Sequence, residues 1–155
     1  MGVEIERKFL VKNDLWQSQA FQGINIKQGY LIAGEDWTLR VRMMPPQAFL
    51  TLKGATKGIR RREYEMEIPL EEAHDLYSDC ICSIEKTRYR VHEGDAVWEV
   101  DEFSGENAGL VIAEIELPEE EASFEKPDWL GAEVSADTRY FNACLAQHPL
   151  SSWAK

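Results

Sequence analysis

The sequence contains few of the residues on which many metal and redox sites depend. Its 155 residues include only three cysteines, Cys80, Cys82 and Cys144, with no CxxC pair, and only three histidines. An odd and small number of cysteines argues against a disulfide framework or a structural zinc site, so we expect free thiols in a cytoplasmic protein. The histidines fall in a predicted helix, beside a turn and near the C-terminus, which argues against a zinc or Ser-His-Asp centre.

Long apolar runs and the GxxxxGK[ST] phosphate-binding loop are also missing. No segment approaches the roughly 18 to 20 apolar residues that span a bilayer. Glu4 and Glu6 stand where a signal peptide would carry its basic and apolar regions. The net charge of −11 argues against nucleic acid or an anionic membrane as a partner. A site for an anion must therefore gather basic residues locally or recruit metal cations, and the sequence does not decide between a monomer and a homodimer.

Turn-forming residues divide the chain into short segments that alternate between apolar and polar positions. We expect strands near 2–11, 24–32, 37–43, 47–54, 58–69, 83–92, 95–104 and 109–118. Helices are expected at 70–79, at 119–126 after Pro118, and at 137–147, where Asp137 can cap the first turn. Eight strands in mostly hairpin succession predict a mainly β (α+β) fold, an eight-stranded antiparallel β-barrel with a few flanking helices.

One face of almost every predicted strand is charged. Side chains two positions apart on a strand share a face, which groups Glu4, Glu6 and Lys8. The same pattern recurs in the later strands, where one face carries Gln28, Tyr30, Arg40, Arg42, Thr51, Lys53, Arg61, Glu63, Glu65, Glu67, Lys86, Arg88, Arg90, Glu99, Asp101, Glu114 and Glu116. The opposite faces are apolar and can pack under the helices. So many charges favour a water-filled lumen, in which they offset one another, over an ordinary solvated sheet.

The chemistry of this face suits one class of ligand. Arginine and lysine bind phosphate oxygens, and carboxylates at alternate positions of a strand suit Mg²⁺ or Mn²⁺, hard cations that prefer oxygen ligands. The pattern therefore predicts a site for a small polyanion together with its metal ions.

These residues resemble the signature of the CYTH domain family, also called triphosphate tunnel metalloenzymes. The resemblance begins with the ExExK pattern of Glu4-x-Glu6-x-Lys8. It continues through Gln28-Gly29-Tyr30, Arg40-x-Arg42, Thr51-Leu52-Lys53, Arg61-x-Glu63-Tyr64-Glu65, Glu85-Lys86-Thr87-Arg88-Tyr89, Asp101, Glu114-x-Glu116 and Asp137-x-Arg139-Tyr140-x-Asn142. It covers nearly the whole chain, which we interpret as one domain over residues 1–155, and is similar to the short bacterial inorganic triphosphatases. It implies an antiparallel tunnel and metal-dependent hydrolysis of a triphosphate.

Carried over residue by residue, the resemblance implies three groups of site residues. Ligands of Mg²⁺ or Mn²⁺ would be Glu4, Glu6, Glu63, Glu65, Asp101, Glu114 and Glu116. The triphosphate would be bound by Lys8, Arg40, Arg42, Lys53, Arg61, Lys86, Arg88 and Arg139. The catalytic candidates are Lys8, Lys86 and Tyr30. Lys8 or Lys86, crowded by other cations, would have a lowered pKa and serve as general acid or base, and the sequence leaves that choice open.

Other activities are compatible with the same residues. A class IV-like adenylyl cyclase would need a nucleoside pocket at one mouth of the tunnel, and no segment obviously supplies one. A thiamine or nucleoside triphosphatase would use the same phosphate site. A non-catalytic module that binds polyphosphate is the third alternative, although simple anion capture would not need so many carboxylates. Phosphate release with and without Mg²⁺ or Mn²⁺ distinguishes these activities.

Overall fold

The computed structural model describes residues 2–153, and antiparallel strands make up most of it. Nine strands lie within these residues: β1 (Gly2–Val11), β2 (Ile24–Ala33), β3 (Trp37–Met44), β4 (Gln47–Gly54), β5 (Arg60–Ile68), β6 (Cys82–Glu93), β7 (Ala96–Phe103), β8 (Val111–Glu116) and β9 (Leu130–Glu133). The helices are α1 (Leu70–Ser78) and α2 (Asn142–Gln147), and the short 3₁₀ helices are η1 (Leu15–Gln19), η2 (Gly105–Asn107), η3 (Thr138–Tyr140) and η4 (Leu150–Ser152). None of the described helices is long and apolar enough to cross a bilayer.

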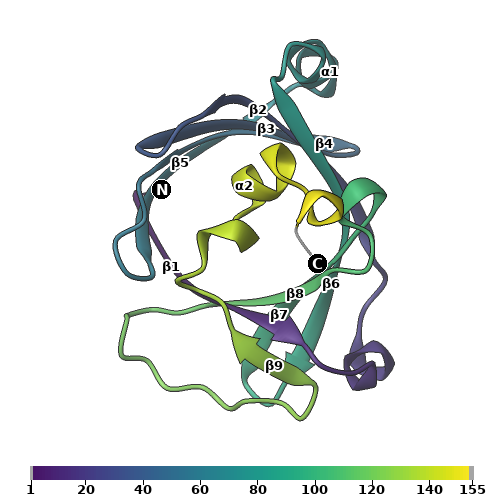
Figure 1. Ribbon diagram of the computed structural model, residues 1–155, viewed down its shortest axis with the longest axis vertical. Coiled ribbons are helices and arrows are strands. Elements are labelled where there is room, and N and C mark those ends of the chain that lie inside the picture. Colours follow the sequence, from purple (N-terminus) through teal and green to yellow (C-terminus); the bar gives the residue numbers. More distant parts are fainter. Residues whose placement is uncertain (1, 154–155) are drawn as a thin grey trace.

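Strands β1 to β8 close into a barrel (Figure 1). Their order around the ring is β5, β4, β3, β2, β6, β7, β8 and β1, with every neighbouring pair antiparallel. Pairing of β1 with β5, through Glu4 opposite Arg61, closes the ring. The ninth strand, β9, was not predicted and pairs with the second half of β1. The expected mainly β fold, an eight-stranded antiparallel β-barrel with few helices, is therefore confirmed.

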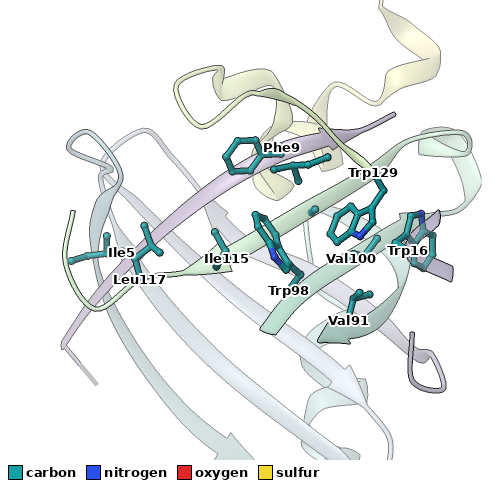
Figure 2. Close-up of a cluster of buried hydrophobic side chains, with 11 residues drawn as sticks. Ile5, Phe9, Trp16, Val91, Trp98, Val100, Ile115, Leu117 and Trp129 are labelled. Atoms are coloured by element: carbon teal, nitrogen blue, oxygen red, sulfur yellow. The ribbon is translucent and has the colours of Figure 1, made fainter. Parts of the chain in front are cut away.

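The main hydrophobic core lies outside the barrel wall, against strands β1, β6, β7 and β8 (Figure 2). Trp98 on β7 is fully buried and packs edge-to-face with Phe9 and Trp129, at ring-centroid distances of 5.8 and 5.6 Å. A smaller core forms where α1 covers β3 and β4, around Val41 and Ala73. The apolar outer faces thus pack partly under a helix, as expected, and partly under an irregular segment.

That irregular segment corrects one prediction. Residues 119–126 form a turn followed by chain without regular secondary structure instead of a helix, and the Ala122 amide donates to the Glu119 carbonyl at 3.2 Å. Ala122 and Phe124 both pack against the main core, and the Phe124 ring lies 5.8 Å from that of Trp98. A helix would turn these two side chains, which are separated by one position, to different sides, whereas here both reach the main core. Packing on the tryptophan cluster therefore overrides the local sequence pattern.

The C-terminal segment turns back into the barrel, where α2 lies inside the ring of strands (Figure 1). The helix predicted over 137–147 is divided, because Phe141 is extended (φ −69°, ψ 138°) between η3 and α2. Asp137 does cap the first turn, accepting a hydrogen bond from the Arg139 amide at 3.1 Å. Leu145 of α2 is fully buried against the apolar end of the inner wall, which includes Ile84. This segment forms a floor at one end of the charged interior.

Candidate active site

Charged side chains pair across the inside of the barrel, between strands that are not neighbours. Lys53 Nζ on β4 lies 2.9 Å from Glu4 Oε2 on β1, although β5 separates the two strands in the ring. Arg88 Nη2 on β6 lies 3.1 Å from Glu114 Oε1 on β8, across β7. Side chains of separated strands meet in this way only on the concave side of a curved sheet. The alternating charged face of the sequence therefore lines the interior.

Asp101 is a buried carboxylate of this interior that contacts two cationic side chains. It is 1% exposed and accepts from Arg88 through both oxygens, at 2.7 Å from Nε and 2.9 Å from Nη2. Lys86 Nζ lies 2.8 Å from the same carboxylate. Planar two-point pairing of this kind fixes the guanidinium orientation. Asp101, expected from the resemblance to hold a metal, is placed to orient two cationic side chains.

The two catalytic lysine candidates have different electrostatic surroundings. Burial lowers the pKa of Lys86 from 10.5 to about 8, because attraction by Asp101 only partly offsets the loss of water and Arg88 repels the ammonium. Burial also acts to lower the pKa of Lys8, but attraction by Glu114 and Glu6 outweighs it, and the pKa of Lys8 is raised. Lys86 is therefore the residue poised to exchange a proton near neutral pH, whereas Lys8 stays charged.

Carboxylates of β1 and β8 crowd one another in another part of the interior. Burial, together with repulsion by Glu114 and Glu4, raises the pKa of Glu6 well above its usual value. Burial and the neighbouring carboxylates, Glu4 foremost, also raise the pKa of Glu116. Burial opposes the ionisation of Glu4 as well, but attraction by the Lys53 ammonium outweighs it and the pKa of Glu4 is lowered to about 2. Neighbouring carboxylates therefore destabilise the charged forms of Glu6 and Glu116, whereas Lys53 stabilises the charged form of Glu4.

This carboxylate group fits a hard divalent cation. Its donors are all oxygens, and Glu4 Oε2 is buried with the Lys53 ammonium 2.9 Å away. Within residues 2–153, as they stand, no three acidic, histidine or cysteine side chains converge on one point where a metal could lie. Glu4 and Glu114 instead lie in ion pairs with Lys53 and Arg88. Phosphate oxygens that attract those cations would leave the carboxylates in need of another positive charge.

Arginine side chains form another charged group of the interior, here called the basic pole. The Nε atoms of Arg40 and Arg42 are buried and donate no hydrogen bond to any described residue. Repulsion by Arg40, then burial, then repulsion by Arg88, lowers the pKa of Arg42 to about 10. Glu65 partly offsets this charge, with its Oε2 3.2 Å from Arg42 Nη2. Three crowded guanidinium groups, two of them with an unused Nε donor, make a favourable place for a polyanion.

Neutral side chains separate these charges. Tyr30 is 3% exposed, and burial raises its pKa despite the attraction of Arg40, so the phenol stays protonated. Its oxygen accepts a hydrogen bond from Gln28 Nε2 at 3.3 Å. Thr51 donates to Glu65 at 3.0 Å. Tyr30 therefore belongs to the wall beside the arginines.

The remaining predicted residues divide between the interior and the surface. Arg61 lies opposite Glu4 on β5 and its Nε donates to the Gly54 carbonyl at 3.1 Å. Glu63 Oε1 lies 3.8 Å from the Lys53 ammonium. Arg139 is not brought to this group: its side chain is 63% exposed and pairs with Asp137 at 2.7 Å. The guanidinium of Arg139 instead packs over the Trp153 ring, so the structure gives no support to its predicted phosphate contact.

Two contributors to the interior had no predicted role in the site. Glu99, expected on the charged face but not among the site residues, accepts from Arg88 Nη1 at 3.1 Å. Asn142 accepts from Lys86 Nζ at 2.8 Å. The motif ending at Asn142 marks this segment, but no spacing rule relates the residue to Lys86, 56 positions away.

Comparison with known proteins agrees with this architecture. The family model of the CYTH domain matches residues 2–143. An inorganic triphosphatase from Acetivibrio thermocellus is 48% identical over 156 residues, covering 99% of each chain. An inorganic triphosphatase from Nitrosomonas europaea is 36% identical over 149 residues, covering 92% of this chain and 96% of that protein.

A solved structure extends the likeness to three dimensions. The crystal structure of an inorganic triphosphatase matches with a TM-score of 0.65 and 34% identity, over 92% of this chain and 93% of that one. The family model, both relatives and this structure each span most of the chain, so the match includes every strand of the barrel. The chain therefore belongs to the CYTH domain family.

Proposed function

We propose that the protein is a divalent-metal-dependent triphosphatase that hydrolyses inorganic triphosphate to diphosphate and phosphate. The observation that carries the proposal is the convergence of Arg40, Arg42 and Arg88 beside a crowded carboxylate group in one enclosed interior. Relatives named inorganic triphosphatase, similar over nearly their whole length, support the same substrate.

The basic pole would bind the phosphate chain. Arg40 and Arg42 offer unused Nε donors, and Lys53 and Arg88 would exchange their carboxylate partners for phosphate oxygens. Lys8 and Arg61 would add charge from the floor end and the β5 wall. An arginine fork binds two oxygens at once, so this group would orient the phosphoryl group as well as attract it.

Glu4, Glu6, Glu114 and Glu116 would hold Mg²⁺ or Mn²⁺, with Glu63, whose charge acts on Glu116, as a further ligand. Glu65 pairs with Arg40 and Arg42 instead. A bound divalent cation would supply neutralisation of charge on the phosphoryl oxygens. Asp101 would support Lys86 and Arg88 instead of holding the metal.

The chain's own contribution to the reaction is positioning and proton transfer. Hydrolysis breaks the bond between a terminal phosphorus and its bridging oxygen, water supplies the new oxygen, and the departing diphosphate gains a proton. Lys86 Nζ, with its pKa lowered to about 8 by burial, would donate that proton to the leaving oxygen and regain one from solvent. Lys8, which stays charged, would stabilise the negative charge that develops.

Phosphate release tests the function directly. The purified protein is assayed on inorganic triphosphate, ATP and thiamine triphosphate, each with Mg²⁺, with Mn²⁺ and with EDTA. We expect inorganic triphosphate to give the highest kcat/KM and EDTA to abolish turnover. Full turnover in EDTA, cyclic AMP as the main product from ATP, or tight triphosphate binding without phosphate release would each overturn the proposal.

A further inference from the structure

Three consecutive residues of the floor contact two of the interior lysines, Lys8 and Lys86. The carbonyl of Tyr140 accepts from Lys8 Nζ at 3.3 Å, and the Phe141 ring centroid lies 5.3 Å from the same ammonium. Asn142 Oδ1 accepts from Lys86 Nζ at 2.8 Å. The floor is therefore more than a closure of the barrel, because its first residues touch the two cations at its border.

The contact between Asn142 and Lys86 has a defined chemical sense. An ammonium group only donates, so the amide must present its oxygen. Lys86 is 1% exposed, and its ion-pair partner among residues 2–153 is Asp101, which it shares with Arg88. A neutral oxygen restrains the ammonium without cancelling its charge, whereas a second carboxylate would weaken the attraction for phosphate.

The position of Asn142 is set by rigid packing. It is the first residue of α2, whose Leu145 is fully buried against Ile84, Phe103 and Ile112. An amide fixed in this way can hold a neighbouring side chain in one direction before substrate arrives.

We propose that Asn142 is a positioning residue, which directs the Lys86 ammonium toward the bound phosphate. The kinetic part of this inference rests on the proposed triphosphatase function. The contact itself does not, because the orientation of Lys86 is a property of the free protein. Loss of the amide oxygen leaves the ammonium with Asp101 alone, and Lys86 then turns with that carboxylate instead of toward the phosphate.

The experiment compares three variants with the parent. Asn142→Leu keeps the size and removes the acceptor, Asn142→Asp keeps an oxygen in the same place, and Gln147→Leu is the matched control on the same helix without a lysine contact. For Asn142→Leu we expect kcat on inorganic triphosphate to fall about tenfold or more, as for other supporting partners of a site. Its KM should change by less than about threefold, because the ammonium charge is retained.

The conservative variant and the control separate positioning from general loosening. Asn142→Asp should keep kcat within about threefold of the parent and raise KM, because its added charge repels the substrate. Gln147→Leu should keep both constants within about twofold. If Gln147→Leu loses kcat as Asn142→Leu does, or if Asn142→Leu turns over like the parent, the inference is wrong.

A second readout does not depend on turnover. Lysine ammonium signals are recorded by ¹H–¹⁵N NMR in EDTA, and the Lys86 signal is identified by its loss in Lys86→Met. We expect Asn142→Leu to shift or broaden the Lys86 signal alone, and Gln147→Leu to leave it in place. An unchanged Lys86 signal in Asn142→Leu refutes the contact. A parent that shows the contact but hydrolyses no triphosphate refutes the proposed function instead.

Discussion

Lys53 Nζ lies 2.9 Å from Glu4 Oε2 inside the barrel, so one ion pair joins the proposed phosphate-binding group to the carboxylate group. Both side chains are largely shielded from water, and each therefore depends on the other for compensation of its charge. Triphosphate that binds Lys53 would free Glu4 from this ion pair, and a divalent cation that binds Glu4 would free Lys53. Each ligand thus frees a residue that the other uses, and their binding is expected to be mutually favourable.

Lys53→Met tests this linkage. Without its ammonium partner, Glu4 should attract cations more strongly, so Mn²⁺ affinity in the absence of triphosphate should rise, as measured by electron paramagnetic resonance of free Mn²⁺. Triphosphate affinity by calorimetry should fall about tenfold or more, because a charge-assisted contact is lost. Lys27→Met is the control, since Lys27 pairs with Glu85 on the exposed surface. Mn²⁺ affinity that stays the same or falls in Lys53→Met contradicts the linkage.

Glu6→Gln should stabilise the metal-free protein at neutral pH. The pKa of Glu6 is raised in the folded state, so its ionisation destabilises the fold as pH rises above the unfolded value of 4.5 and toward the folded pKa. Glutamine removes this cost, and Tm in EDTA should rise by about 2 to 4 °C at about pH 7 and hardly at all at about pH 4.

Glu4→Gln is the matched opposite case. Lys53 lowers the pKa of Glu4 to about 2, so its ionised form contributes stability at neutral pH that is lost as pH falls from the unfolded value of 4.5 through the folded pKa. Thermal melts should therefore show a lower Tm than the parent at neutral pH. Shifts of the same sign for both glutamine variants would refute the assigned electrostatics.

Arg42 and Arg88 should act on one ligand. Each alanine variant is expected to weaken triphosphate binding by about 1.5 to 3 kcal/mol in calorimetry, the range for charge-assisted contacts. The double variant should lose less than the sum, because both side chains share a partner and repel one another in its absence. Arg7→Ala, which breaks an outer pair with Glu133, should bind like the parent. Parent-like affinity in all three interior variants would mean that the charged faces do not meet around a ligand.

Lys86 should control the alkaline side of the pH profile. If its ammonium donates the proton to the leaving group, kcat/KM falls as pH rises through about 8. Lys86→Arg keeps the charge but loses the exchangeable proton, so its reduced activity should lack this decline. Lys8→Arg, by contrast, should retain the decline, because the pKa of Lys8 is raised. A decline near pH 8 that persists in Lys86→Arg assigns it to another group.

Local alternation was enough to determine the strands and the content of their inner faces. Glu4, Glu6 and Lys8 share a face on any strand, whatever that strand packs against, because the side-chain period is two. The charge of those faces then excluded a dry core and led to a closed barrel. For the same reason all eight predicted strands are present, each within two residues of its expected ends.

Tertiary structure decided which charges meet and how each one behaves. The pairing of Lys53 with Glu4, the lowered pKa of Lys86 beside the raised pKa of Lys8, and the contact of Asn142 with Lys86 all join residues far apart in the chain. Residues 119–126 are irregular because their apolar side chains pack on Trp98, which lies on another strand. Ionisation and helix formation both depend on burial and partners, and those are set by the whole barrel, not by neighbours in sequence.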